Sequence, residues 1–322
     1  MKKFLEHIIS RVIILVILFF IIHCFYQGYI TKIDDSGIDI KFNSLKKKEN
    51  LDLIIMGDSR AERQISPKII DSVTDINSIN LAISSGDINR IRKFFINNQK
   101  FLNEVNKNQS TLLISASDWQ INDNSQSWGY LSLSTFSLLS PLERIKFLNN
   151  KSDYFRFIYN GYKTYIIKVL GTSLMNNKKT SDSDGFLGID REFSFKDSEK
   201  IKLENHPYYS KINYNGWRFK LFEDSLRYLN SNFDNVIIMI PPTTDYWKLK
   251  TKNTDAQKMT LGYIERLKNL VLNENLMNIK IWDLYNFPPE NINDSDFYDI
   301  EHLNVKGAKK LSLFISKKLH VN

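Results

Sequence analysis

An alternation of five strand-like segments, the first of them an apolar run at residues 53–56, with segments of helical pattern constrains the fold of this chain more than any other feature. An apolar run of four to eight residues between turn signals is typical of a strand buried on both faces. Strands that alternate with helices favour a parallel sheet covered by helices. We therefore predict an α/β fold, a three-layer sandwich with a mostly parallel central sheet. The predicted strands are residues 53–56, 78–81, 111–115, 235–240 and 279–284.

Apolar residues at helical spacing predict helices between and after these strands, and Ser66-Pro67 predicts the start of the first helix. The predicted helices are residues 66–72, 88–105, 217–233, 259–271 and 305–319. Residues 122–216 have no such alternation and are longer than a simple crossover needs. We expect them to form an insertion that covers the carboxyl edge of the sheet and shapes access to it, and most of its aromatic residues to form its own small core.

Residues 51–63, LDLIIMGDSRAER, read as a buried strand that breaks at Gly57. Glycine allows a tight change of direction, which would present Asp58 and Ser59 at the carboxyl edge of the sheet. Open α/β sheets bind their ligands at this edge. The alternative interpretation is a plain helix N-cap, because Asp and Ser are both common there.

A second segment, residues 297–307 with the sequence FYDIEHLNVKG, carries Asp299 and His302. A hydroxyl nucleophile needs a base within hydrogen-bond reach, and that base needs an acceptor that fixes its tautomer. Ser59, His302 and Asp299 would supply these three roles. Glu301 competes as the acceptor, but it directly precedes His302 and is expected to point away. The alternative is a surface histidine ahead of a helix.

The two segments together resemble the SGNH/GDSL hydrolase superfamily. Its nucleophile block, Gly-Asp-Ser, corresponds to Gly57-Asp58-Ser59, and its last block, Asp-x-x-His, corresponds to residues 299–302. The resemblance spans residues 51–319. It implies a serine ester hydrolase or acyltransferase with the catalytic residues Ser59, Asp299 and His302.

The resemblance also implies an oxyanion hole, formed by the backbone N–H groups of Ser59 and of either Ser85 or Gly86. A plain strand-to-helix loop is the alternative for residues 82–87. The family pattern has Gly-x-Asn-Asp after the third strand, where this chain has Ala-Ser-Asp-Trp at 116–119. The asparagine donor is absent, and an ionised Asp118 would repel a developing oxyanion. This departure counts against efficient simple ester hydrolysis.

Other side chains are weaker candidates for substrate binding. Arg60 adjoins Ser59 and is a candidate for an anionic substrate group, although an arginine at a helix start is often structural. Tyr246 and Trp247 follow the strand at 235–240 and are candidate pocket walls, and Asp118 lies near the same edge. The chain has no HExxH motif, no paired CxxC and no nucleotide-binding glycine pattern, so we expect no metal and no cofactor. Cys24 is the single cysteine, which excludes an internal disulfide.

The N-terminus has an unbroken apolar run at residues 12–22, extended on both sides and preceded by Lys2, Lys3 and Arg11. The whole stretch reaches the roughly 20 residues that span a bilayer. Positive charge before it places the N-terminus in the cytoplasm. We predict a signal anchor at 1–30, a juxtamembrane linker at 31–50 and an extracytoplasmic domain at 51–322. A cleaved signal peptide and a buried helix are the alternatives, but residues 23–26 lack the small residues that cleavage needs.

A tethered extracytoplasmic domain of this kind resembles proteins that modify surface polymers, either DltD-like proteins of teichoic acid D-alanylation or polysaccharide O-acetyltransferase-like proteins. The resemblance implies an acyl-ester or polymer substrate, lipid contact through the N-terminal helix, and a membrane-bound O-acyltransferase partner. The net charge of +8 fits an anionic neighbour, and no motif supports nucleic acid. One alternative is a noncatalytic binding or scaffold subunit. Another is a secreted lipase, but an uncleaved anchor counts against secretion.

Overall fold

The computed structural model describes residues 11, 14, 41, 45, 48–84, 86–97, 99–121, 179–181, 186–194, 214 and 216–320. The chain divides into two compact units, Met1–Asp35 with Trp128–Leu174, and Ser36–Ser127 with Met175–Asn322. Almost all the described residues belong to the second unit, which contains the sheet and the candidate site.

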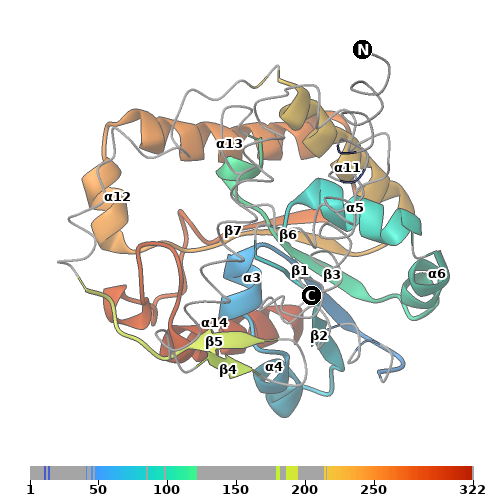
Figure 1. Ribbon diagram of the computed structural model, residues 1–322, viewed down its shortest axis with the longest axis horizontal. Helices are drawn as coiled ribbons and strands as arrows, with labels where there is room; N and C mark the ends of the chain where they lie inside the picture. The colour runs from blue at the N-terminus through green and yellow to red at the C-terminus, as the bar shows by residue number, and fades with distance from the viewer. Residues whose placement is uncertain are drawn as a thin grey trace. The chain divides into compact units, whose positions relative to one another are not determined.

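The second unit contains a five-stranded parallel sheet (Figure 1). The strands lie in the order β2-β1-β3-β6-β7, and each neighbouring pair is parallel. Their bounds are β1 Leu53–Gly57, β2 Ser78–Asn80, β3 Thr111–Ser115, β6 Val236–Ile240 and β7 Ile279–Asp283. The predicted mostly parallel α/β sheet is therefore confirmed.

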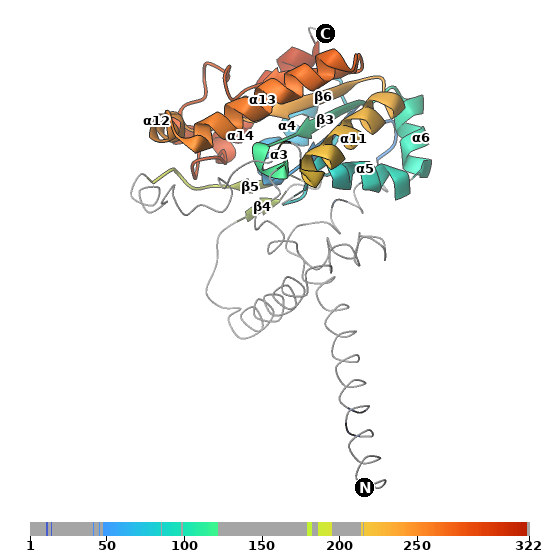
Figure 2. The ribbon, with the colours of Figure 1, turned by 90° about the horizontal axis from the view of Figure 1, so that it is seen from above.

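Helices cover both faces of this sheet (Figure 2). Alternate residues of β1 enter different cores, because successive side chains of a strand point to opposite faces. Ile54 and Met56 pack with α5, α6, α11 and α13, whereas Leu53 and Ile55 pack with α3, α4 and α14. The helices are α3 Ser59–Gln64, α4 Pro67–Val73, α5 Ile88–Asn97, α6 Gln99–Lys107, α11 Trp217–Asn232, α12 Asp245–Thr251, α13 Asp255–Asn273 and α14 Val305–His320.

The elements differ from the sequence prediction in three places. The stretch predicted as one helix at 88–105 is two helices, α5 and α6. The loop expected after β6 contains the short helix α12, whose N-cap Thr244 accepts a hydrogen bond from the Trp247 N–H. Within the predicted insertion, β4 (Lys179–Ser181) and β5 (Leu187–Ile189) form an antiparallel pair, and β5 packs against α3 and α14. The rest of that insertion lies outside the described residues.

The order of the strands fixes where a ligand would bind. The connections from β1 run first to β2 on one side and then to β3 on the other, so the strand order reverses between β1 and β3. Open parallel sheets bind ligands in the crevice beyond the carboxyl ends of the two strands at such a reversal. Gly57 and Ser115 pair at these ends, directly before the segments that carry Ser59 and Asp118.

The described residues of the predicted linker at 31–50 contact the rest of the second unit. Lys41 makes a buried ion pair with Glu62, with Nζ 2.6 Å from Oε1. Leu45 packs on the larger core, and the Lys48 Nζ donates to the Ser78 carbonyl. Among the described residues no helix is long and apolar enough to cross a membrane. The predicted signal anchor at 1–30 lies outside them except for residues 11 and 14, so it stays a prediction.

Candidate active site

The turn at residues 57–59 changes direction sharply because Gly57 has a φ of +133°, a conformation that side chains with a Cβ rarely adopt. A Cβ at this position would lie 2.6 Å from the carbonyl oxygen of Ser115. Asp58 is the N-cap of α3 and accepts the Arg60 N–H at 3.0 Å. The turn therefore places Ser59 in the first position of a helix, at the carboxyl edge of the sheet.

The Asp58 carboxylate is buried, with 2% of the residue exposed, and hydroxyl and N–H donors surround it. The Ser117 Oγ donates to it at 2.7 Å, the Trp119 Nε1 at 3.2 Å and the Ser115 Oγ at 3.3 Å. The segment after β3 thus fixes the turn after β1. In the family pattern that the sequence resembles, this segment carries the asparagine donor, but here its side chains hold Asp58.

Residues from the end of β2 hold the other side of the turn. The buried Asn80 donates its Nδ2 to the carbonyl oxygens of Ala61 and Ile65, both at 2.8 Å, which satisfies carbonyls at the end of α3. The Ile83 N–H donates to the Gly57 carbonyl at 3.1 Å. Gly86 comes so close to that carbonyl that a Cβ would collide with it. Helix α3 and the turn before it are therefore held from both neighbouring strands.

The loop at residues 297–303, named the His302 loop, is closed by its own backbone. Phe297 and Leu303 form an antiparallel bridge, and the Tyr298 N–H donates to the His302 carbonyl at 2.9 Å. The Asp299 Oδ1 accepts the backbone N–H of Glu301 at 2.9 Å and of His302 at 2.8 Å. Asp299 thus orders the loop as well as contacting the imidazole.

Ser59, His302 and Asp299 form one chain of hydrogen bonds. The Ser59 Oγ lies 2.7 Å from the His302 Nε2, and the His302 Nδ1 lies 2.9 Å from the Asp299 Oδ2 and 3.0 Å from its Oδ1. An ionised carboxylate only accepts hydrogen bonds, so in the neutral imidazole the Nδ1 carries the proton and the Nε2 accepts from the serine. Ser59 is partly exposed, and 17% of the His302 side chain is exposed. The structure thus brings together the three residues that the sequence predicts.

The charge of Asp299 is stabilised in place. Burial by itself would raise the pKa of this carboxyl, but the imidazole of His302 and the N–H groups of Glu301 and His302 outweigh that effect and hold the pKa below its usual value. The carboxylate is therefore ionised at neutral pH and able to stabilise an imidazolium.

Several contacts join the His302 loop to α3 and α12, and the sequence predicted none of them. The Gln64 Nε2 donates to the Glu301 carbonyl at 2.8 Å, and the Arg63 Nη1 donates to the Tyr298 hydroxyl at 2.7 Å. On the other side, the N–H and the hydroxyl of Thr244 both donate to the Ile300 carbonyl. No short motif marks these residues, because their partners lie far away in the sequence.

Donors for an oxyanion are only partly in place. No acceptor in the described part of the chain takes the Ser59 N–H. The Gly86 N–H donates to the Ile83 carbonyl at 2.7 Å, so it is occupied within its own turn. Ser85, the other predicted donor, lies outside the described residues. The Ser59 N–H is thus the one predicted donor that this geometry leaves available among the described residues.

The weaker candidates have structural contacts. Arg60 is 7% exposed, and its Nε lies 3.7 Å from the Asp58 Oδ2. The Asp118 Oδ1 accepts the Trp119 N–H, and its Oδ2 accepts from the Thr260 hydroxyl at 2.5 Å. The hydrogen bond from Thr260 ties Asp118 to α13.

Glu301 is partly buried, and burial raises the pKa of its carboxyl although the nearby charges of Arg60 and His302 lower it.

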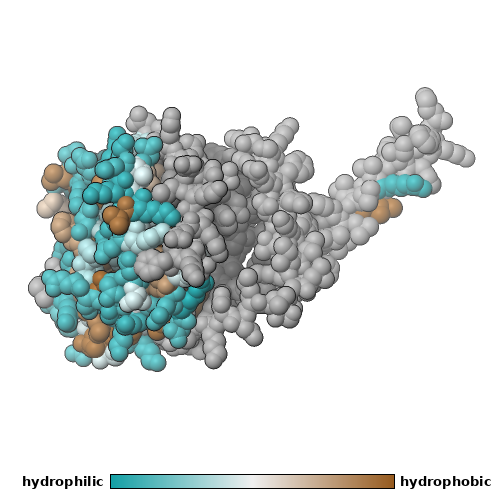
Figure 3. Space-filling view, turned by 90° about the vertical axis from the view of Figure 1, so that its left-hand side faces the viewer, coloured by the Kyte–Doolittle hydropathy of each residue, from teal (hydrophilic) through white to brown (hydrophobic). Residues whose placement is uncertain are grey.

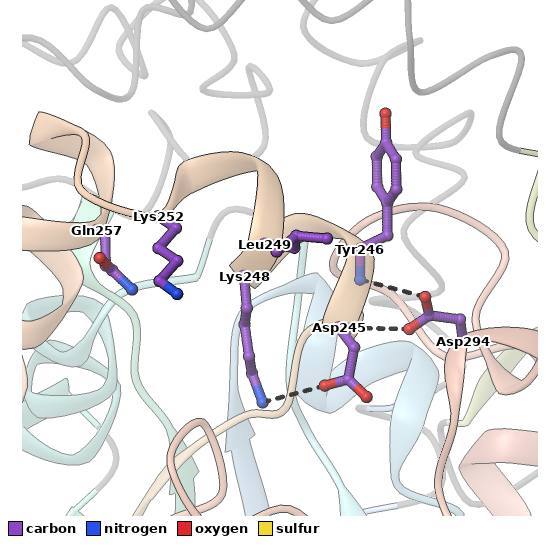
Figure 4. A pocket seen from close by; sticks show the side chains of 7 residues that line it. All are labelled: Asp245, Tyr246, Lys248, Leu249, Lys252, Gln257 and Asp294. Atoms are coloured by element: carbon purple, nitrogen blue, oxygen red, sulfur yellow. Dashed lines mark hydrogen bonds and ion pairs between the residues drawn. The ribbon is translucent and has the colours of Figure 1, made fainter.

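Tyr246 lines an open pocket of about 670 Å³ beside α12 (Figure 4). The Asp294 carboxylate accepts the backbone N–H groups of Asp245 and Tyr246 at 2.7 and 3.1 Å and so caps the start of this helix. Trp247, the other predicted wall, is only 4% exposed and packs inward. The full lining of this pocket is Asp245, Tyr246, Lys248, Leu249, Lys252, Gln257 and Asp294.

On the face in Figure 3 the described residues are mostly hydrophilic, with hydrophobic ones in small separate groups.

No protein-family model matches this chain, and a search of the curated proteins finds no match either. Among the described residues no group of three or more His, Cys, Asp or Glu side chains is arranged to hold a metal ion. The expectation that the site uses no metal and no cofactor stays a prediction. Any assignment of chemistry therefore depends on the geometry of the site itself.

Proposed function

We propose that this protein is a serine-dependent esterase or O-acyltransferase of the SGNH/GDSL type. One observation carries the proposal: the Ser59 hydroxyl, the His302 imidazole and the Asp299 carboxylate are linked in that order at 2.7 and 2.9 Å. A nucleophile, a base and an orienting acceptor within hydrogen-bond reach are what covalent acyl transfer needs. The five-stranded parallel sheet with the strand reversal beside Ser59 supports the same class.

In the first half-reaction the Ser59 Oγ attacks the carbonyl carbon of an ester while the His302 Nε2 takes the hydroxyl proton. Asp299 stabilises the imidazolium that forms, and the Ser59 N–H donates to the oxyanion. The tetrahedral intermediate then breaks its bond to the alcohol oxygen, which receives the proton from the Nε2. The products are the free alcohol and an acyl group on Ser59.

In the second half-reaction an acceptor hydroxyl attacks the acyl carbonyl carbon while the His302 Nε2 takes its proton, and the bond between the acyl group and the Ser59 Oγ then breaks as the Nε2 returns the proton to that oxygen. Water as the acceptor gives hydrolysis, and a sugar hydroxyl gives transfer. We propose that the natural substrate is an acyl ester of a cell-surface carbohydrate polymer, and that residues 1–30 anchor the domain on the extracytoplasmic side of the membrane. The apolar run at 12–22 after Lys2, Lys3 and Arg11 supports this location. We also propose a membrane-bound O-acyltransferase as the partner beside which the domain acts.

The test is the release of nitrophenol from p-nitrophenyl acetate by the purified full-length protein. Acetyl release from an O-acetylated polysaccharide is measured in parallel. We expect turnover that Ser59→Ala reduces at least about a thousandfold while the thermal unfolding transition is kept. Equal turnover by the wild type and Ser59→Ala would contradict the proposal. Protease protection of the C-terminal domain in intact cells would contradict the extracytoplasmic location.

A second candidate is a noncatalytic binding or scaffold subunit of a membrane acyltransferase system. The segment after β3 favours it, because Ser117 and Trp119 donate to Asp58 and the family's asparagine donor is missing. An enzyme that lacks one oxyanion donor typically loses about 10²–10³ in rate, which leaves activity that is slow but measurable. A scaffold shows no Ser59-dependent turnover at all, so the p-nitrophenyl acetate assay separates the two functions.

A further inference from the structure

The ring of Tyr298 lies against one face of the His302 imidazole. The two ring centroids are 5.5 Å apart and the planes differ by 17°, which is an offset stacked arrangement. The edges of the imidazole are occupied by Ser59 at the Nε2 and by Asp299 at the Nδ1. Hydrogen bonds at two edges leave the ring able to rock about the line that joins its two partners. A stacked ring on one face opposes that motion.

The phenol of Tyr298 is itself held at its far end. The Arg63 Nη1 donates to the Tyr298 hydroxyl at 2.7 Å, and the Arg63 Nη2 lies 3.4 Å from the Ser84 Oγ. Burial raises the pKa of Tyr298 to about 12, against the opposing charge of Arg63, so the phenol is neutral at physiological pH. At its near end the Tyr298 N–H bonds to the His302 carbonyl at 2.9 Å. The phenol is thus held at its hydroxyl, and the backbone of the same residue is bonded to that of His302.

The support of Arg63 continues into the interior. The Ser84 Oγ donates to the Glu62 Oε2 at 2.6 Å, and Glu62 pairs with the buried Lys41 at 2.6 Å. Arg63 is four residues after Ser59 in α3, which places both on the same face of that helix. One short helix therefore carries the candidate nucleophile and the residue that holds the tyrosine against the candidate base.

We propose that Tyr298, held by Arg63, is a positioning residue that fixes the plane of the His302 imidazole toward Ser59. This inference depends on the proposed acyl-transfer function. Tyr298 touches neither the substrate nor the reacting atoms and acts only through the imidazole. Misplacement of a catalytic group by about 1 Å is enough to cost about a hundredfold in rate.

The kinetic test compares Tyr298→Leu with Tyr298→Phe in the p-nitrophenyl acetate assay. Tyr298→Leu removes the stacked ring, and we expect kcat to fall about tenfold to a hundredfold with KM nearly unchanged. Tyr298→Phe keeps the ring and loses only the hydrogen bond, so we expect a fall of about threefold. Rescue by phenylalanine separates positioning from a simple need for the hydroxyl. Wild-type kcat in a folded Tyr298→Leu variant would overturn the inference.

Arg63 is tested by a double-mutant cycle. Arg63→Met and Tyr298→Phe remove the same hydrogen bond from opposite sides, so their effects on kcat are expected not to add. Full additivity would overturn the role of Arg63. This cycle keeps the ring in place and so stays informative if Tyr298→Leu does not fold.

A spectroscopic measurement tests the geometry without turnover. In the inactive Ser59→Ala background, the ring current of Tyr298 is expected to move the imidazole proton signals of His302 upfield. The shift should persist in Tyr298→Phe and disappear in Tyr298→Leu, with His302→Gln used to assign the signals. A signal that is the same in all three would overturn the stacking. Absence of Ser59-dependent turnover in the wild type would instead overturn the proposed function, with the ring-current shift unaffected.

Discussion

The turn at residues 57–59 and the His302 loop each bring an aspartate to the same edge of the sheet, but the two carboxylates are surrounded differently. Asp58 is 2% exposed and accepts from backbone, hydroxyl and indole donors, with the Arg60 Nε more distant at 3.7 Å. The Asp299 side chain is 43% exposed and faces the imidazole of His302. Adjacency to a candidate nucleophile therefore does not by itself make an aspartate catalytic. The partners that its oxygens meet decide whether it only holds the protein in place, as Asp58 does, or also contacts the base, as Asp299 does.

The largest expected effect is on catalysis, at the His302 loop. Asp299→Asn keeps an oxygen that caps the loop but loses the negative charge that orients and stabilises the imidazolium. We expect kcat on p-nitrophenyl acetate to fall about a thousandfold to ten-thousandfold while the unfolding transition stays close to that of the wild type. A large loss of stability with little loss of activity would give Asp299 the role that we assign to Asp58.

The next effect is on stability, at the turn. Gly57→Ala forces a Cβ into a φ of +133° and against the Ser115 carbonyl. We expect it to lower the free energy of unfolding by about 3 kcal/mol, measured by urea denaturation. A stability equal to that of the wild type would show that the turn at residues 57–59 relaxes without cost. The turn would then not be a rigid support for Ser59.

Asp58→Asn should affect stability more than Asp299→Asn does. An amide nitrogen at this position would face donors that the carboxylate now satisfies, and we expect a loss of about 2 kcal/mol in the free energy of unfolding. Asp75→Asn, at an exposed aspartate of the same unit, is the control and should change little. If Asp58→Asn lowered kcat as far as Asp299→Asn with no loss of stability, the division of roles would be wrong.

The smallest effect is the pH dependence of stability that comes from Asp299. Its pKa is depressed in the folded state, so its contribution is present above the ordinary aspartate value of about 4 and is lost as the pH falls through the lower folded value. Because 43% of the side chain is exposed, we expect less than about 1 kcal/mol. The stability difference between the wild type and Asp299→Asn should shrink from pH 5 to pH 3 in thermal unfolding. A difference that grows over this range would contradict the sign.

The sequence predicted the features that depend on local residue patterns. It did not predict the features that depend on contacts between residues far apart in the chain. The five strands and their parallel arrangement follow from apolar runs such as 111–115, which matches β3. The meeting of Ser59 with His302 follows from two short motifs at the ends of strands that share one edge. Helix α12 was missed because its seven residues are too few for a helical apolar pattern, although Thr244 caps it locally and Asp294, far along the chain, accepts two more of its N–H groups. Tyr298 and Arg63 were missed because neither matters until the fold brings the other beside it.

The central claim is that Ser59 is a nucleophile that His302 activates, and covalent labelling tests it most directly. The full-length protein is incubated with a serine-directed fluorophosphonate and the modified peptide is identified by mass spectrometry. We predict phosphonylation of Ser59 in the wild type, slowed at least about a hundredfold in His302→Ala. A folded wild-type protein that is not labelled at Ser59, or that is labelled equally fast without His302, would contradict the account.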